Sequence, residues 1–212
     1  MENMLKYLDE DGIVQVITMN CTSTFSLNTT QTYFDHERPR TDPVVCTNVL
    51  SLFAKYGREH ELEKSFEWIY HVLLHRAYVD GTRYYVTAEC FLYFLSRLLS
   101  TPGLSSNKAA LLRPLLRERI YERVGTGGDA LALAMRILVC ASVGLPTSGA
   151  DKDALLKLQL DDGGWGEGWF YRNGSTGKRI GNRGVTTVLA LKALGVSEGL
   201  SGDAIFPSTK AA

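Results

Sequence analysis

The chain has 212 residues, of which 45% are hydrophobic and 22% are charged, a composition typical of a folded globular protein. Its 23 basic and 23 acidic residues give a formal net charge of zero, so we do not expect it to bind nucleic acid or an anionic membrane. No apolar run approaches the roughly 20 residues that a membrane-spanning helix needs. The N-terminal segment lacks the continuous apolar core of a signal peptide, which favours a cytoplasmic protein.

The cysteines are isolated in the sequence and form no CxxC pair, so the pattern does not predict a zinc site. They are Cys21, Cys46, Cys90 and Cys140. Three of them lie in apolar helical patterns, and free cysteine is commonly buried. We therefore predict buried free thiols in a reducing compartment, and no metal.

Strong helical patterns begin at Asp42, which is suited to cap a helix whose first residue is Pro43. Apolar residues then recur at helical spacing until Gly57, which ends the helix. A second helix is predicted over about 59–76, with apolar residues on one face and charged residues on the other. Thr87 is suited to cap a third helix, whose sequence CFLYFLSRLL is apolar on almost every side.

Further helices follow in the second half of the chain. One is predicted over about 106–123, and Pro114 inside it predicts a kink or a break. Asp129 is suited to cap another helix, ALALAMRILVCASV, which is again apolar nearly all round. An amphipathic helix over about 151–160 comes next, and the last helix runs from Gly184 to Gly195.

Amphipathic helices thus alternate with helices that are apolar on nearly all sides. A single layer of helices would not produce this alternation, whereas two concentric layers would, because outer helices cover the inner ones. We predict an all-α fold, namely an α/α toroid or double-layered helical barrel that is incomplete within this chain. Residues 1–196 form this partial domain, and the small, polar residues of 197–212 predict a disordered tail.

Three segments repeat the same order of features: an Asp-Gly turn, an aromatic or β-branched stretch, a polar loop and a mostly buried helix. The turns are Asp11-Gly12, Asp80-Gly81 and Asp162-Gly163. They lie roughly 70–80 residues apart, which corresponds to about two helical hairpins per repeat. The repetition supports a fold built from stacked pairs of helices.

Residues 17–32 do not fit this repeat, because they contain no charged residue, are rich in threonine and show neither helical nor strand periodicity. The flanking strings GIVQV and YFDHERPR would join naturally without them. We interpret this atypical insert as translated intron sequence. The alternative is a surface loop that the fold tolerates.

The segment from Gln159 to Gly184 contains the most specific pattern, Q-x-x-D-G-G-W. Its members are Gln159, Asp162, Gly163, Gly164 and Trp165. The glycine pair allows a tight turn after an outer helix, the tryptophan packs on the next helix, and the glutamine can bond backbone groups at a helix end. We interpret these residues as a structural turn between repeats.

Aromatic residues beside a basic loop form the candidate pocket. Trp169, Phe170 and Tyr171 come first, followed by Arg172, Lys178, Arg179 and Arg183. Aromatic faces attract cations, including carbocations, and basic side chains attract diphosphate, so a pocket with both would suit a prenyl diphosphate. The alternative is a core cluster beside a solvated basic loop. Tyr84 and Tyr85 either line the end of an inner-helix cavity or fill its rim.

The Q-x-x-D-G-G-W pattern and the alternating helices resemble the α/α-toroid terpenoid cyclases and protein prenyltransferases. More specifically, the chain resembles fungal drimane-type sesquiterpene synthases over nearly all of residues 1–16 and 33–196. The strings that carry this resemblance are YFDHERPRTDPVVCTNVLSLF, RAYVDGTRYYVTAECFLYFLSRLL and GWFYRNGSTGKRIGNRGVTT. That family joins an N-terminal haloacid-dehalogenase-like domain to a C-terminal class II cyclase domain, and the resemblance lies in the cyclase domain.

The resemblance implies a two-step reaction. An aspartate of a D-x-D-T-T motif protonates farnesyl diphosphate and ring closure gives a drimane diphosphate, after which the dehalogenase-like domain removes the diphosphate with the help of Mg²⁺. The 212 residues contain no D-x-D-T-T motif and no dehalogenase-like motif. We therefore expect no catalytic residue and no cofactor in this chain, with Mg²⁺ needed only by the phosphatase domain, and no activity of the chain alone.

The resemblance implies a pocket role for aromatic and polar residues on the candidate segments. These are Tyr84, Tyr85, Trp169, Phe170, Tyr171, Asn182 and Arg183. The expected ligand is a prenyl diphosphate such as farnesyl diphosphate, and an incomplete toroid is expected to self-associate through exposed apolar helices.

Two alternatives remain. One is a non-catalytic α/α-toroid module that binds an isoprenoid or a partner chain. The other is a glycan- or lipid-processing enzyme on a related fold, which would need a pair of carboxylates, whereas the inner-helix segments offer only Glu89.

Overall fold

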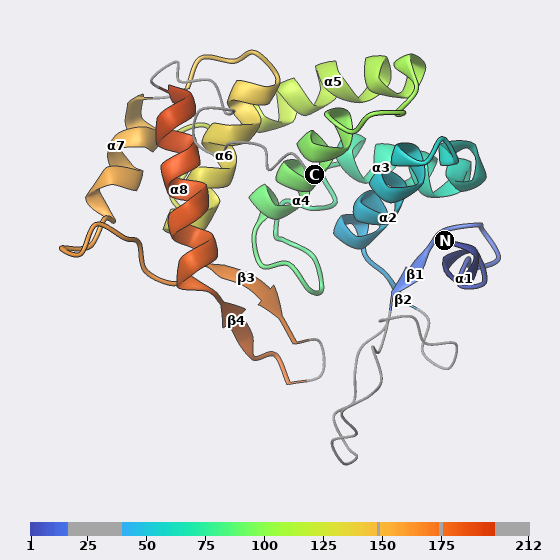
Figure 1. Cartoon of the computed structure of the whole chain (residues 1–212), viewed down its shortest axis with the longest axis horizontal. Helices are drawn as coiled ribbons and strands as arrows, with labels where there is room; N and C mark the ends of the chain where they lie inside the picture. The colour runs from blue at the N-terminus through green and yellow to red at the C-terminus, as the bar shows by residue number, and fades with distance from the viewer. Residues whose placement is uncertain (17–39, 148, 174–175, 198–212) are drawn as a thin grey trace, which may run out of the picture.

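The computed structural model describes residues 1–16, 40–147, 149–173 and 176–197 (Figure 1). The insert predicted at 17–32 lies outside these residues, as does the predicted tail apart from Ser197. The helices are α1 (Glu2–Leu5), α2 (Pro43–Lys55), α3 (Glu63–Leu74), α4 (Ala88–Leu99), α5 (Ser106–Tyr121), α6 (Ala130–Ser142), α7 (Gly149–Lys157) and α8 (Arg183–Ser197), with a 3-10 helix η1 (Glu59–Leu62) before α3. The strands are β1 (Gln15–Val16), β2 (Arg40–Thr41), β3 (Trp169–Arg172) and β4 (Arg179–Gly181).

The helices form two layers. The inner helices α2, α4, α6 and α8 pack side by side in this order, and each contacts the next (Figure 1). The outer helices cover them: α3 packs on α2, α5 packs on α4 and α6, and α7 packs on α6. The prediction of an all-α, double-layered α/α arrangement is therefore confirmed for the described residues.

Burial explains why the inner helices have apolar sequences on all sides. Every residue of α6 from Ala130 to Cys140 is buried, because α4 and α8 flank this helix and α5 and α7 cover it. The predicted caps of α2 and α6 are confirmed: Asp42 accepts a hydrogen bond from the Val44 amide at 2.9 Å, and Asp129 accepts one from the Ala132 amide at 2.9 Å.

Two local predictions need correction. Thr87 precedes α4 as expected, but its side chain makes no capping hydrogen bond, and its hydroxyl instead lies 3.4 Å from the Cys90 sulfur. Of the kink or break predicted at Pro114, the break does not occur, because α5 continues through the proline. Pro114 and Ala110 are both exposed on the outer layer, so water can solvate the Ala110 carbonyl that lacks an amide partner.

Helix α8 is less buried than the repeat pattern predicted. Its Ala190 and Ala193 are fully buried against α6, yet Val185, Val188 and Leu191 are 42%, 45% and 50% exposed. The inner layer ends at α8 among the described residues, so no further described helix covers this face. The expectation of a mostly buried helix therefore fails for α8.

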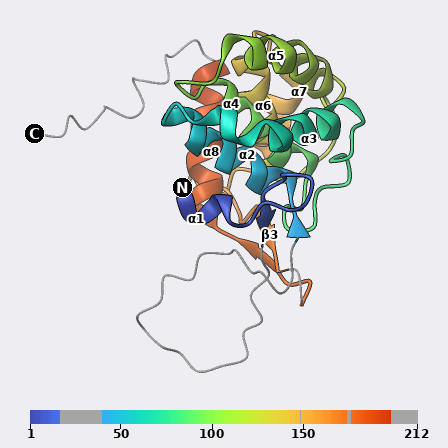
Figure 2. The same ribbon diagram turned by 90° about the vertical axis from the view of Figure 1, so that its right-hand side faces the viewer.

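Two short antiparallel strand pairs accompany the helices, which the sequence did not predict. Strand β1 pairs with β2, and β3 pairs with β4. Each pair leads into an inner helix, β2 into α2 and β4 into α8, and both pairs lie at the same end of the helical layers (Figures 1 and 2).

The backbone confirms the repeated Asp-Gly turns. A bridge joins Leu8 to Val14 in the first turn, and a bridge at the same spacing joins Gln159 to Trp165 in the third. The glycines of all three turns have positive φ angles, 75° at Gly12, 79° at Gly81 and 82° at Gly163. These turns place corresponding chain segments before α2, α4 and α8.

The cysteines that the structure describes, Cys46, Cys90 and Cys140, are free and buried, as predicted. Burial raises the pKa of Cys90 and of Cys140 to about 11, so both thiols stay protonated at neutral pH. Cys21 lies outside the described residues. No helix among the described residues is long and apolar enough to cross a membrane.

Candidate functional site

The candidate site is built where the second and third repeats meet. The backbone N–H of Arg172 at the end of β3 donates to the Tyr84 carbonyl at 2.7 Å. The Arg172 guanidinium donates to the carbonyls of Thr82, at 3.0 Å, and Arg83, at 3.2 Å. These bonds hold the turn before α4 against the β3–β4 hairpin, although the two segments are far apart in sequence.

This junction assembles the aromatic cluster, which comprises Tyr84, Tyr85, Tyr93, Phe94, Phe170 and Tyr171. Tyr84 stacks on Tyr171 with centroids 6.0 Å apart and rings inclined by 9°. Tyr85 meets Phe170 edge to face at 5.7 Å and Phe94 at 5.9 Å. Such offset and edge-to-face contacts stabilise aromatic pairs beyond simple burial, so the rings fix one another in place.

An open apolar groove of about 530 Å³ borders the aromatic cluster. It is lined by Tyr93, Phe94, Met135, Phe170, Asn182, Gly184, Val185, Val188 and Leu189, which come from α4, α6, β3 and the start of α8. No charged side chain is among them. The size and apolar lining fall within the range of small-molecule binding sites.

A second hollow of about 460 Å³, which we call the basic hollow, continues from the apolar groove. Tyr93, Phe94, Val188 and Leu189 line both, so the two spaces share one wall. The basic hollow is further lined by Asn48, Ser51, Arg97, Thr101 and Lys192.

The structure places the predicted pocket residues in different roles. Phe170 and Asn182 line the apolar groove. Tyr85 and Tyr171 contact Phe170 or each other within the aromatic cluster. Tyr84 lies behind them, 1% exposed, and its hydroxyl has no hydrogen-bond partner among the described residues.

Trp169 is held through its backbone. Its N–H donates to one carboxylate oxygen of Asp129 at 3.1 Å, while the other oxygen caps α6 through the Ala132 amide. A single aspartate therefore fixes both the start of α6 and the start of β3. The sequence indicated the cap but not this second contact.

Arg183 is directed to the turn of the third repeat and is absent from the lining of the apolar groove. Its guanidinium lies 2.5 Å from Asp162 and donates to the Trp165 carbonyl at 3.1 Å. The hydrogen bond from Arg183 and the Gly164 amide lower the pKa of Asp162. Arg172 and Arg183, two members of the predicted basic cluster, thus both bind carbonyl or carboxylate groups of the protein itself.

The residues of the Q-x-x-D-G-G-W pattern form one turn. Gln159 donates from its side-chain amide to the Gly163 carbonyl at 2.8 Å, and Asp162 accepts from the Gly164 amide at 3.1 Å. Trp165 is fully buried, and its indole N–H donates to the Leu155 carbonyl at 2.7 Å. The turn therefore joins the end of α7 to the core beside α8.

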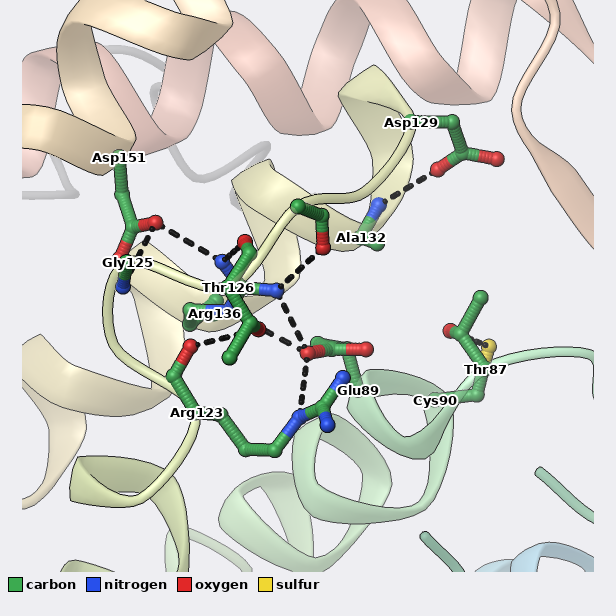
Figure 3. A network of polar contacts seen from close by, with 11 residues as sticks. Thr87, Glu89, Cys90, Arg123, Gly125, Thr126, Asp129, Ala132, Arg136 and Asp151 are labelled. Carbon is green, nitrogen blue, oxygen red and sulfur yellow. Dashed lines mark hydrogen bonds and ion pairs between the residues drawn. The ribbon is translucent and has the colours of Figure 1, made fainter. Parts of the chain in front are cut away.

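A buried ion network, which the sequence did not reveal, lies beside the site (Figure 3). Arg136 of α6 is fully buried and lies 2.8 Å from both Glu89 of α4 and Asp151 of α7. Arg123 also binds Glu89, at 3.0 Å, and Arg136 donates to the Thr126 carbonyl. The arginines neutralise both carboxylates, so Glu89 is no free acid facing a cavity, as the glycan- or lipid-processing alternative would need.

Asp42 is a third buried carboxyl group and lies beside the aromatic junction. Burial raises its pKa, and the Thr82 side chain and the amides of Val44 and Val45 oppose this shift. One of its oxygens has no hydrogen-bond partner among the described residues. Within the same residues, no group of three or more His, Cys, Asp or Glu side chains is placed to hold a metal ion.

The described residues thus form a double layer of helices with repeated Asp-Gly turns and an aromatic-lined groove. Residues 1–56 match the family described as the sesquiterpene cyclase astC-like C-terminal domain. The chain is also 44% identical over 196 residues to the drimenol cyclase drtB of Aspergillus calidoustus, a match that covers 92% of this chain and 33% of that protein. No solved structure matches the chain.

The predicted resemblance to drimane-type sesquiterpene cyclases is therefore confirmed. The chain corresponds in sequence to one part of such a protein, since it spans about a third of the length of the curated relative.

Proposed function

We propose that this chain forms the isoprenoid-binding wall of a sesquiterpene cyclase and binds a prenyl diphosphate such as farnesyl diphosphate. The observation that carries the proposal is the apolar groove, whose wall includes Phe94, Phe170 and Tyr93 of the aromatic cluster. Apolar side chains can bury an isoprenoid chain, and aromatic faces can stabilise the positive charge that develops on it during cyclisation.

We further propose that the chain alone binds this ligand without cyclising it. Cyclisation begins when a carboxylic acid protonates an alkene, and such an acid has to face the ligand in its protonated form. The D-x-D-T-T motif is absent from the 212 residues, Glu89 is bound by two arginines, and Asp42 caps α2. None of these carboxylates lines the apolar groove.

Calorimetric titration with farnesyl S-thiolodiphosphate, an analogue that resists hydrolysis, tests binding. Phe170→Ala should weaken binding about tenfold, because the ligand loses apolar contact area and one aromatic face. Tyr121→Ala is the matched control, since Tyr121 is 68% exposed on α5 and does not line the groove. Equal affinities of the two variants and the wild type would rule out the groove as the binding site.

Product analysis after incubation with farnesyl diphosphate tests the second part of the proposal. We expect no cyclic product from the purified chain. Formation of a drimane-type product would contradict the proposed lack of an initiating acid.

The exposed apolar face of α8 supports a second candidate role, association with another chain. Val185, Val188 and Leu191 are each more than two-fifths exposed, which is unusual for neighbouring apolar residues of an inner helix. Leu191→Glu should lower the sedimentation coefficient if copies of the chain associate through this face. An unchanged monomeric value for wild type and variant would exclude self-association.

A further inference from the structure

The basic hollow differs from the apolar groove in its charge. Two cations, Arg97 of α4 and Lys192 of α8, line it, and no acidic residue does. Among the described residues neither side chain forms an ion pair with an acidic residue. Other basic residues do have acidic partners, namely Arg58, Arg76, Lys108, Arg119, Arg123 and Arg136. Two uncompensated cations that face one hollow make it attractive to an anion.

The other polar residues of the basic hollow limit what can bind there. The Ser51 hydroxyl already donates to the Thr47 carbonyl at 2.9 Å, and the Thr101 hydroxyl donates to the Arg97 carbonyl at 3.0 Å. Arg97, Lys192 and the side-chain amide of Asn48 therefore provide the donors. A site with several donors and two positive charges fits an anion rich in acceptor oxygens, such as a diphosphate.

The apolar groove and the basic hollow follow one another along the same two helices, α4 and α8. On α8 the apolar groove begins at Gly184, and the basic hollow ends at Lys192. Eight residues of helix correspond to about 12 Å, so the ends of the combined space are well separated. On α4, Phe94 belongs to the aromatic cluster and contacts Phe170, and Arg97 lies almost one turn further on.

The residues between the two ends form a continuous apolar wall. Tyr93, Phe94, Val188 and Leu189 line both spaces, so an isoprenoid chain can extend along them from one end to the other. Burial raises the pKa of Tyr93, while the positive charge of Arg97 opposes the shift, which places the two side chains within electrostatic reach.

We propose that Arg97 and Lys192 bind the diphosphate group of the ligand and direct its isoprenoid chain toward the aromatic cluster. This assignment rests on the proposed function. It replaces the basic loop of the third repeat as the diphosphate site, because Arg172 and Arg183 bind protein carbonyl or carboxylate groups there. It also fixes the direction of the ligand, with the hydrocarbon tail beside Phe170 and the diphosphate near the last turn of α4.

Calorimetry with two probes, farnesyl S-thiolodiphosphate and farnesol, tests the assignment on the whole chain. Farnesol has the same hydrocarbon chain but no diphosphate. Arg97→Gln and Lys192→Gln should each weaken binding of the thiolodiphosphate about tenfold, and the double variant about 100-fold, because each removes a charge-assisted contact. Farnesol affinity should stay within about twofold of wild type, and Lys178→Gln, which alters an exposed residue outside both hollows, should change neither affinity.

The dependence of binding affinity on ionic strength provides a second test. Raising the salt concentration should weaken binding of the thiolodiphosphate by the wild type and leave farnesol binding unaffected, since only the former depends on charge. Loss of this salt dependence in the double variant would support the assignment.

The outcomes separate this assignment from the proposed function. If the double variant binds the thiolodiphosphate as tightly as wild type does, the diphosphate site lies elsewhere and the assignment fails, while the groove proposal stands. If both probes lose affinity in equal proportion, the two residues act on the fold and the assignment also fails. If wild type binds neither probe, both proposals fail together.

Discussion

Helix α4 carries a charged residue near each end, and the two are in opposite surroundings. Glu89 in the first turn is buried and bound by Arg136 and Arg123. Arg97 in the last turn is exposed, lines the basic hollow and has no acidic partner among the described residues. The comparison distinguishes charges that fix helix packing from charges that remain available to a ligand.

The buried network gives the largest expected effect. Arg136→Met would leave Glu89 with only Arg123 and Asp151 with no cation, both in the core. Removing one partner of a buried ion pair typically costs about 3–5 kcal/mol of the free energy of unfolding. Urea denaturation measures this change directly.

Arg97→Met is the matched control for this experiment, because it also replaces an arginine with methionine, but at an exposed position in the last turn of α4. It should change the free energy of unfolding by less than about 0.5 kcal/mol, as expected for an exposed residue without an ion pair. If the two variants lowered the free energy of unfolding equally, the charge of Arg97 would also be needed for helix packing, and the distinction would fail.

Asp42 extends the comparison, since it is buried, accepts hydrogen bonds from backbone amides and forms no ion pair with the residues that the structure describes. Asp42→Ala should cost about 1 kcal/mol through loss of the cap. Asp42→Asn should cost less, because an amide can cap the helix and carries no charge to desolvate. Urea unfolding of both variants checks the order, and a larger loss in Asp42→Asn would contradict it.

The raised pKa of Asp42 also predicts a pH dependence. The folded state binds the proton more tightly than the unfolded state, so this group makes the protein more stable as the pH falls from neutral through its folded pKa toward its unfolded value near 4. Asp42→Asn should remove this contribution from the pH profile of the unfolding free energy. A profile identical to that of wild type would show that Asp42 does not titrate in this range.

The exposed pair of Asp162 and Arg183 gives the smallest effect. Arg183 lowers the pKa of Asp162, so the pair stabilises the protein above the unfolded pKa near 4, and this stabilisation is lost as the pH falls through the lower folded value. Arg183→Gln should flatten the acid limb of the stability profile slightly, and high salt should do the same to wild type. If the loss of stability at acid pH were independent of salt and unchanged by Arg183→Gln, groups other than this pair would cause it.

Much of the fold could be predicted because it depends on local features. The caps at Asp42 and Asp129 and the glycines of the Asp-Gly turns act within a few residues of chain. The alternation of apolar and amphipathic helices also indicates which helices belong to the inner layer and which to the outer layer. The short strand pairs escaped prediction because each depends on pairing with a segment more than five residues away.

The site was less predictable, because its residues come together only through packing. CFLYFLSRLL is apolar on nearly every side, so the sequence could not show that Tyr93 and Phe94 face the groove. The sequence also could not show that Arg183 turns to Asp162, or that Arg136 joins Glu89 to Asp151 across three helices. Phe170 could be selected in advance, since aromatic residues beside a glycine-rich loop favour a binding role.

The most direct test of the central claim is to map backbone amide chemical shifts of the labelled chain by NMR during titration with farnesyl S-thiolodiphosphate. The largest shifts are predicted at Phe170 and Val188 along the apolar groove and at Arg97 and Lys192 in the basic hollow. Shifts confined to Lys178 and Arg179 of the hairpin, or no shifts at saturating ligand, would contradict binding in this groove.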